Sequence, residues 1–522
     1  MTMGNSSRWL ILIAPAAVLL AVVVVFAVFA TSKPSVASDS TALAKVDLAM
    51  GGGKVLSVHV TGPKGKAIPV ALTAGRIVPR VKLRPNEPVS VVAVVSRPGW
   101  IGWLAGSRDT ERLSLHTPTT SLENQYLTLA SGAPLRLTFS HPVSTFAYGQ
   151  PGALQHRTFA KSQATVTIAR PSTAGTLSVA AAPRSWETAS VTSVAWFPAG
   201  APTSAVVNPA PGRSISATTP ITLTFSKPYS QVLGSTMPKL SPDPSGSWRS
   251  IDSHTIEFKP SGYGFGLGTN ISVDLPSGVQ VVGGHASWTV PSGSSLRVNE
   301  ILAQLGYLPL KWQPTSRPVK ATLAAQLDAA TKPPSGQFAW TYSDTPSSLE
   351  GQWNPNQQTV VTEGALMAFE ENEGIYGDDP TPSEVWHQLI TAEIKGQSSN
   401  FGYSYVTVSE GSPESLNLWH NGRTVYTTPV NTGISVAPTA TGTYPVFEHV
   451  PVTTMTGVNP DGTPYSDPGI PWVSYFNGGD ALHGFIRASY GFPQSLGCVE
   501  MPYANAARVY PFTPIGTLVN VE

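Results

Sequence analysis

Cysteine is nearly absent from this chain: its 522 residues contain one, Cys498. A single cysteine excludes an internal disulfide, and no cysteine–histidine spacing typical of a zinc site occurs in the sequence. Charge is also scarce, because charged residues make up 12% of the chain and the formal net charge is +1. The composition therefore provides no long-range field that would attract nucleic acid or an acidic partner.

Glycine and proline, by contrast, are plentiful, with 47 and 48 residues. This composition is typical of short strands joined by turns and not of long solvated helices. The chain is also too long for one ordinary domain, and its length indicates about three or four. We therefore expect a multidomain, mainly β protein.

One long hydrophobic run is present, because residues 9–30 carry no charge. About 20 apolar residues are enough to cross a bilayer, so the run predicts a single membrane anchor, with residues 1–31 forming a cytoplasmic stub and the span. The alternative is a signal peptide cleaved after Val-Phe-Ala at 28–30, which would lead to secretion. In both cases the body of the protein works outside the cytoplasm.

The segment after the hydrophobic run reads as a linker followed by a β domain. Residues 32–44 are rich in Ser, Thr and Ala, which is typical of a flexible tether. Apolar and polar residues alternate at 55–60, and apolar residues dominate 89–95. These patterns predict strands within a β domain at 45–120.

A repeated motif then appears. Residues 133–142 and 219–228 share the pattern Pro-x-x-Leu-Thr-Phe-Ser-x-Pro. Alternate apolar positions would face a core, and the trailing proline would end each strand. The motif resembles that of bacterial immunoglobulin-like modules, which we place at 121–207 and 208–290. Neither module shows a set of side chains suited to chemistry, so we interpret them as β-sandwich modules of a stalk.

Helical patterns characterise residues 297–395. Segments at 301–308, 364–370 and 383–389 space apolar residues at helical intervals, and Ser383 is the predicted cap of the last helix. Their order resembles a small helical domain of the peptidoglycan-binding type, with a long insertion after the first helix. The alternative is a helical spacer that binds no ligand.

The sequence around the cysteine has the form of a catalytic turn. It reads Ser-Leu-Gly-Cys-Val at 495–499, and His483 lies fifteen positions before Cys498. A thiol becomes a good nucleophile only as a thiolate, and a neighbouring imidazole is the usual means of forming one near neutral pH. The pattern predicts an acyl-transfer site. The alternative is a small buried hydrophobe, since free cysteines are commonly buried.

Residues 400–522 read as a mostly β domain, with a hairpin predicted at Asn421-Gly422. Within it lie Thr-Gly-Thr-Tyr-Pro at 441–445, His-Gly at 483–484 and the Ser-x-Gly-Cys turn. This set, in this order, resembles the L,D-transpeptidase (YkuD-type) catalytic domain. Two positions depart from the family's usual pattern, because Leu496 replaces a histidine and Glu500 replaces an arginine.

The resemblance implies a mechanism. Cys498 would attack the carbonyl that joins an L-centre to a terminal D-amino acid in a peptidoglycan stem peptide, with His483 as general base. The main-chain carbonyl of Gly484 would orient the imidazole. The N–H groups of Gly497 and Cys498 would bind the oxyanion, and Ser495 would support the turn.

Arg487 and Tyr475 are candidates to hold the substrate's carboxylate or peptide; an ordinary ion pair and a packed ring are the alternatives. The resemblance implies 3→3 crosslinking when an amine opens the acyl-enzyme and L,D-carboxypeptidation when water does. A non-catalytic peptidoglycan-binding scaffold and a secreted cysteine peptidase of other specificity stay open. The resemblance to L,D-transpeptidases implies an enzyme that needs no metal or cofactor and serves cell-wall biogenesis and cell shape. It also makes carbapenem β-lactams candidate inhibitors.

Overall fold

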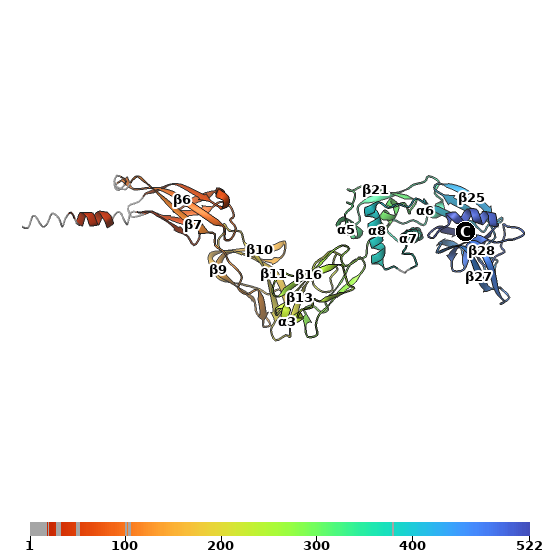
Figure 1. Cartoon of the computed structure of the whole chain (residues 1–522), viewed down its shortest axis with the longest axis horizontal. Coiled ribbons are helices and arrows are strands. Elements are labelled where there is room, and N and C mark those ends of the chain that lie inside the picture. The colour runs from red at the N-terminus through yellow and green to blue at the C-terminus, as the bar shows by residue number, and fades with distance from the viewer. Residues whose placement is uncertain are drawn as a thin grey trace, which may run out of the picture. The chain divides into compact units, whose positions relative to one another are not determined.

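The computed structural model describes residues 18, 20–27, 33–48, 53–99, 102, 106–377 and 380–522. These residues form two compact units, and strands outnumber helices in both (Figure 1). The first unit comprises Met1–Val206, Thr224–Pro228 and Gly278–Val282, and the second comprises Val207–Leu223, Tyr229–Ser277 and Gly283–Glu522. The prediction of a multidomain, mainly β protein is confirmed.

The predicted membrane anchor at 9–30 lies largely outside the described residues. Of this run, only residues 18 and 20–27 are described, and they are helical. In the part of the chain that the structure describes, no helix has the length and apolar character needed to span a bilayer. The anchor and its alternative, signal cleavage, stay predictions.

The first unit begins with two antiparallel sheets. One has the strand order β1-β2-β5-β4 and the other has the order β3-β6-β7. Their bounds are β1 Ser35–Ser38, β2 Ala44–Asp47, β3 Lys54–Thr61, β4 Val70–Thr73, β5 Arg76–Pro79, β6 Pro88–Ser96 and β7 Arg108–His116, with a short helix, η1, at Pro63–Gly65. Alternate residues of β6 are buried, as a half-buried strand requires. The prediction of a flexible linker at 32–44 is wrong for Ser35–Ser38, because these residues form β1 and pair with β2.

The core of these two sheets also receives a side chain from much later in the chain. Trp186 is 5% exposed and packs in the same cluster as Ile77 and Val91. Its indole N–H donates to the Thr41 carbonyl at 3.0 Å. The predicted boundary at residue 120 therefore separates residues that share one core.

Within residues 121–207, strands β8 to β12 form one five-stranded sheet of order β10-β9-β11-β12-β8. Its strands are β8 Tyr126–Leu129, β9 Leu135–Gln150, β10 Ala153–Ile168, β11 Gly175–Ala182 and β12 Ser190–Pro198. The first copy of the repeated motif lies in β9, but Pro142 sits inside this strand and does not end it. The β9–β10 pairing shifts register between Thr138 and Thr145, and this irregularity accommodates the proline. One sheet of this order does not support the predicted immunoglobulin-like sandwich.

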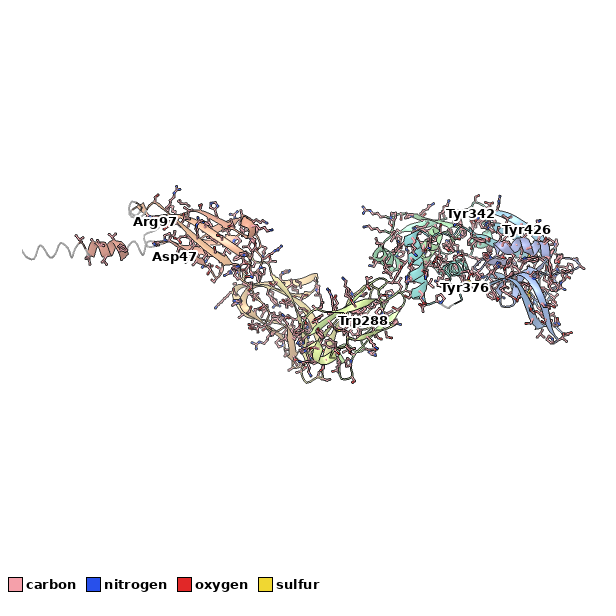
Figure 2. All side chains as sticks on the ribbon, in the orientation of Figure 1. Asp47, Arg97, Trp288, Tyr342, Tyr376 and Tyr426 are labelled. Carbon is pink, nitrogen blue, oxygen red and sulfur yellow. The ribbon has the colours of Figure 1, made fainter. Side chains whose placement is uncertain are left out.

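The second copy of the motif lies in β14, Ile221–Phe225, which ends before Pro228 as predicted. Around it the chain forms β13 Ser204–Asn208, α3 Tyr229–Leu233, β15 Lys239–Ser241, β16 Gly246–Ser250, β17 Thr255–Pro260, β18 Asn270–Asp274, β19 Gln280–Val281 and β20 Ser287–Thr289. Within the second unit, β15, β18 and β20 form a sheet, and β16 pairs with β17. Trp288, labelled in Figure 2, is 1% exposed and belongs to the core of this region.

Helices predominate in residues 297–395, and the predicted insertion contains two antiparallel strands, β21 and β22, with α5 between them along the chain. The elements are α4 Ser295–Gln304, β21 Leu310–Pro314, α5 Leu323–Thr331, β22 Gly336–Trp340, α6 Ser347–Glu350, α7 Val360–Glu373 and α8 Pro382–Lys395. The predicted Ser383 cap of α8 is wrong. Thr381 caps this helix instead, because its hydroxyl accepts from the Glu384 N–H while the Glu384 carboxylate accepts from the Thr381 N–H.

This helical segment packs directly against the domain that follows it. The Tyr342 hydroxyl donates to Asn421 Oδ1 at 2.9 Å, and its ring meets the edge of Trp419 at a centroid distance of 5.3 Å. The Tyr376 hydroxyl donates to the Phe447 carbonyl at 2.8 Å. Figure 2 shows Tyr342 and Tyr376 on this part of the ribbon. Residues 297–395 thus form part of the support of the last domain.

The last domain contains two sheets. One has the order β25-β24-β23-β31-β26 and the other has the order β27-β28-β29-β30. Their bounds are β23 Ser404–Ser409, β24 Ser415–His420, β25 Arg423–Pro429, β26 Gly442–Pro445, β27 Glu448–Val458, β28 Pro464–Asn477, β29 Asp480–Gly484, β30 Val499–Met501 and β31 Leu518–Val521, with α9 Tyr503–Val509 and η2 Tyr510–Phe512 between the last two strands. Side chains from both sheets and from α9 form one buried core. The hairpin predicted at Asn421-Gly422 is confirmed, with positive φ at both residues.

Candidate active site

Two short parallel strands bring together residues that are far apart in the sequence. β29 and β30 are neighbours, and His483 is the register partner of Glu500. Cys498 immediately precedes β30, so the fold places it next to the strand that carries His483. Residues 481–484 of β29 are buried, which fixes the position of this strand in the core.

His483 and Cys498 both line a cavity of about 820 Å³. Ser495, Arg487 and Tyr475 line it as well, so the structure gathers five of the predicted site residues around one space. The remaining walls come from Thr454, Met455, Thr456, Asn459, Tyr465, Asp467, Ile470, Gly479, Asp480, Phe485, Gln494, Leu496 and Glu500. Gly484 and Gly497, the other two predicted residues, are the chain neighbours of His483 and Cys498.

The His483 imidazole is held in an orientation that suits a base. Its Nδ1 lies 3.0 Å from the Gly484 carbonyl, which requires the proton to be on Nδ1. Nε2 is then an acceptor; it is buried and has no hydrogen-bond partner among the described residues. The side chain is 2% exposed, and burial lowers its pKa below the ordinary value of 6.5. The imidazole is therefore neutral near pH 7 and available to accept a proton.

The Cys498 thiol is protonated at rest. Its S–H donates to the Gly479 carbonyl at 3.5 Å, and the side chain packs against the small apolar cluster around Ile470. Burial is the largest cause that raises the pKa of the thiol, the Ala481 N–H opposes it, and the carboxylates of Asp480 and Glu500 add to it, so that the pKa is raised to about 12. A reaction at neutral pH therefore requires the proton to leave during attack on the substrate.

The turn before the cysteine is held by Ser495. The Ser495 hydroxyl donates to the Cys498 carbonyl at 2.5 Å and accepts from the Gly497 N–H at 3.2 Å. To act as an oxyanion donor, the Gly497 N–H would have to release the Ser495 hydroxyl and donate to the substrate's oxyanion instead. Gly497 has φ of +118°, and a Cβ at this position would meet the Asp480 carboxylate.

Replacing Gly497 by alanine should slow acylation of Cys498 by about ten- to a hundredfold, because the turn would move away from Asp480 and carry the thiol with it. The measurement is the rate of adduct formation with a carbapenem, followed by intact-protein mass spectrometry. The matched control is Gly478→Ala, since Gly478 also has positive φ but its Cβ would meet no atom within 4 Å. Equal rates for the two variants would contradict this assignment of the turn.

Arg487 and Glu500 form an ion pair at the cavity wall. Arg487 Nε donates to Glu500 Oε2 and its Nη2 donates to Glu500 Oε1, both at 2.7 Å. The glutamate that replaces the family's usual arginine thus has an arginine as its partner. The guanidinium is already engaged, and a role for Arg487 in substrate binding stays a prediction.

Tyr475 lies on β28 opposite Ala481 of β29. Tyr475 and Cys498 pack against the same apolar cluster around Ile470. Burial raises the pKa of the Tyr475 hydroxyl, and Cys498 adds to this shift. Its substrate-binding role also stays a prediction. In the described ranges, no group of three or more His, Cys, Asp or Glu residues is arranged to hold a metal ion.

Several cavity residues were not identified from the sequence. Asp480 leaves no room for a side chain at position 497, because its carboxylate, which accepts from the Ala440 N–H at 3.1 Å, lies where that side chain would go. Tyr465 and Phe485 line the space beside the thiol. No local pattern marks these residues, because their positions depend on the β28–β29 pairing.

Solved structures that are similar to this chain include L,D-transpeptidases. The L,D-transpeptidase from Mycobacterium smegmatis is 13% identical and matches over 62% of this chain and 100% of its own, with a TM-score of 0.21. L,D-transpeptidase 3 from Mycobacterium tuberculosis, in complex with a faropenem-derived adduct, is 11% identical over 60% and 96%, with a TM-score of 0.21. The catalytic domain from the Enterococcus faecium enzyme is 24% identical over 23% and 96%, with a TM-score of 0.21.

Comparison with protein families gives a match confined to the last domain. No curated protein matches the chain. Residues 403–521 match the YkuD family, described as the L,D-transpeptidase catalytic domain, and this range contains every residue of the cavity. The chain therefore carries a YkuD-type L,D-transpeptidase catalytic domain at residues 403–521.

Proposed function

We propose that this protein is a cell-wall L,D-transpeptidase that forms 3→3 peptidoglycan crosslinks through an acyl-enzyme on Cys498. The observation that carries the proposal is the buried Nε2 of His483, which has no partner among the described residues and lines the same cavity as the chain's one thiol. An unpaired buried acceptor is costly, and such atoms are commonly retained for chemistry.

The first half-reaction would form the acyl-enzyme. As Cys498 Sγ attacks the carbonyl carbon of the stem peptide's L–D bond, His483 Nε2 takes the thiol proton. A sulfur–carbon bond forms, the carbon–nitrogen bond breaks, and the imidazolium returns its proton to the departing amine. For a meso-diaminopimelate tetrapeptide, the departing group is D-alanine. The Gly484 carbonyl supports the imidazolium, because it accepts from Nδ1.

The second half-reaction would release the acyl group. An amine from a neighbouring stem peptide enters the cavity, and His483 removes its proton as nitrogen attacks the thioester. The carbon–sulfur bond breaks and the thiolate recovers its proton from the imidazolium. Attack by water in place of the amine gives L,D-carboxypeptidation of the same stem.

The location we propose is the extracytoplasmic face of the cell membrane, with residues 9–30 as the anchor. The hydrophobic run supports this assignment, since it is long enough to span a bilayer. Secretion after cleavage at 28–30 would place the same catalytic domain in the same compartment.

The test is incubation of the purified full chain with disaccharide-tetrapeptide, followed by mass spectrometry of the products. A dimer that has lost one D-alanine is expected from crosslinking, and a disaccharide-tripeptide is the product of carboxypeptidation. An unchanged tetrapeptide would contradict the enzymatic proposal. Sacculus binding that is unaffected by Cys498→Ala, together with that result, would instead favour a non-catalytic scaffold.

A further inference from the structure

The Arg487–Glu500 ion pair is placed to act on the reaction. Glu500 is 4% exposed, whereas the Arg487 side chain is 31% exposed at the cavity wall. Arg487 is the one lysine or arginine among the described residues that line the cavity. Two donors of a planar guanidinium meeting both oxygens of one carboxylate give a geometry that lysine cannot reproduce.

The Glu500 side of the pair is fixed by the sheet. Glu500 is the register partner of His483 on the neighbouring parallel strand, so the two side chains share a face of the ladder. Its main chain is held from the other side by Asn431, because the Asn431 N–H donates to the Glu500 carbonyl at 3.0 Å and the Glu500 N–H donates back at 2.9 Å. The carboxylate therefore has little freedom to move away from the reacting residues.

The Arg487 side of the pair holds the loop at 485–494. Its Nη2 also donates to the Gln494 carbonyl at 3.3 Å, and its guanidinium lies 4.6 Å from the centre of the Phe485 ring. The Phe485 ring in turn forms a T-shaped contact with the His483 imidazole at a centroid distance of 6.0 Å. Contacts thus run from the carboxylate of Glu500, through the guanidinium and one aromatic ring, to the imidazole.

We propose that Arg487 and Glu500 are positioning residues for the reaction of Cys498 and His483. Their ion pair fixes the cavity wall beside the imidazole, and each partner cancels the charge that the other would place beside the thiol. This inference rests on the proposed function. It gives Arg487 a different role from the substrate binding that its residue type suggests, because Glu500 already occupies two of its donors.

The charge argument has a definite sign. A carboxylate beside a thiol opposes formation of the thiolate, and a guanidinium favours it. After burial, Glu500 contributes to raising the pKa of Cys498, and it raises the pKa of His483 whereas Arg487 lowers it. Removing one partner should therefore shift the reactivity of the thiol in one direction, and removing the other should shift it in the opposite direction.

Other groups near the thiol stay constant in this comparison. Besides the ion pair and the thiol itself, the charged and titratable residues that line the cavity come from β28 and β29, and they are Tyr465, Asp467, Tyr475, Asp480 and His483. Only Arg487 and Glu500 differ among the variants below. Alkylation rates of Cys498 that shift in opposite directions therefore report the charges of this ion pair.

The experiment measures the rate at which iodoacetamide alkylates the full chain at pH 8, by intact-protein mass spectrometry. Cys498 is the chain's one cysteine, so every alkylation event reports this thiol. We expect Glu500→Gln to alkylate about three- to tenfold faster than the unmodified protein, and Arg487→Gln to alkylate about three- to tenfold slower, since tenfold corresponds to one pKa unit. The double variant should lie within about threefold of the unmodified protein.

The matched control is Glu257→Gln, which removes one partner of the Arg249–Glu257 ion pair between β16 and β17 and should leave alkylation unchanged. Circular dichroism checks that each variant is folded, and Arg487→Lys, which retains the charge, should restore most of the rate lost in Arg487→Gln. Should Arg487→Gln not fold, Glu500→Gln decides alone. Single variants that shift in the same direction, or a slower Glu500→Gln, would overturn the inference.

Alkylation requires no acyl donor, so failure of this inference can be distinguished from failure of the proposed function. Opposite shifts in a protein that leaves tetrapeptide unchanged would mean that the transpeptidase proposal fails while the electrostatic role of the pair stands. Normal acylation with unshifted alkylation would mean that the inference about the pair fails alone.

Discussion

Replacement of Cys498 by alanine should abolish the covalent adduct with a carbapenem or a tetrapeptide donor, with a loss of turnover on the order of 10⁴–10⁶. The sulfur is the proposed nucleophile, and the chain has no second cysteine that could take its place. Intact-protein mass spectrometry measures this directly, because acylation adds the mass of the donor fragment to the chain.

The fold should survive this substitution. Cys498 is partly exposed at the cavity and lies at the edge of a small apolar cluster, so losing its sulfur leaves the main core intact. Thermal unfolding should therefore occur within a few degrees of that of the unmodified protein. Persistence of the adduct in folded Cys498→Ala would place the nucleophile elsewhere and refute the proposed site.

Replacement of His483 by glutamine should slow acylation by about 10²–10⁴-fold, because the amide cannot accept the thiol proton. Glutamine fills most of the space of the imidazole, so the loss reports chemistry more than packing. The matched control is His420→Gln: His420 lies on β24, its Nδ1 is 2.9 Å from Ser404 Oγ, and it does not line the cavity. A His483→Gln rate equal to that of His420→Gln would remove the imidazole from the mechanism.

The pH dependence of acylation should further distinguish the unmodified protein from the His483→Gln variant. Burial lowers the pKa of His483, so its neutral form persists as pH falls, and the acid limb of the unmodified protein should lie below pH 6.5. In His483→Gln, reaction depends on thiolate that forms without help. Since the thiol pKa is raised to about 12, the residual rate should rise about tenfold for each pH unit between 7 and 10. A flat profile in the variant would contradict this role for the imidazole.

Local patterns in the sequence predicted the parts of the fold that local chemistry determines. Asn421-Gly422 specifies a tight hairpin by itself, because both residues tolerate positive φ. The same reasoning applies to the true cap of α8, since Thr381 and Glu384 have capping-box spacing and Ser383 does not cap the helix. Pro142 shows the limit of such rules, because a register shift with β10 lets β9 continue past it.

Features that depend on tertiary structure could not be predicted in this way. Trp186 completes a core that begins near residue 42, and nothing in its own neighbourhood indicates this contact. At the candidate site, motif order indicated His483 and Cys498, which do line one cavity. The partnership of Arg487 with Glu500 required the parallel pairing of β29 and β30, because residues thirteen positions apart meet only once the strands align.

The contacts of Tyr342 and Tyr376 determine where the chain can be cut to give a catalytic fragment without an exposed apolar surface. Trp419 is 5% exposed in the whole chain, with Tyr342 against its ring and its indole N–H donating to the Asp344 carbonyl at 3.0 Å. Cutting the chain near residue 400 would uncover this aromatic surface and leave that indole without its acceptor. A longer fragment, begun before α4, would keep Tyr342 and Asp344 against Trp419, and of the two fragments we expect this one to resist aggregation.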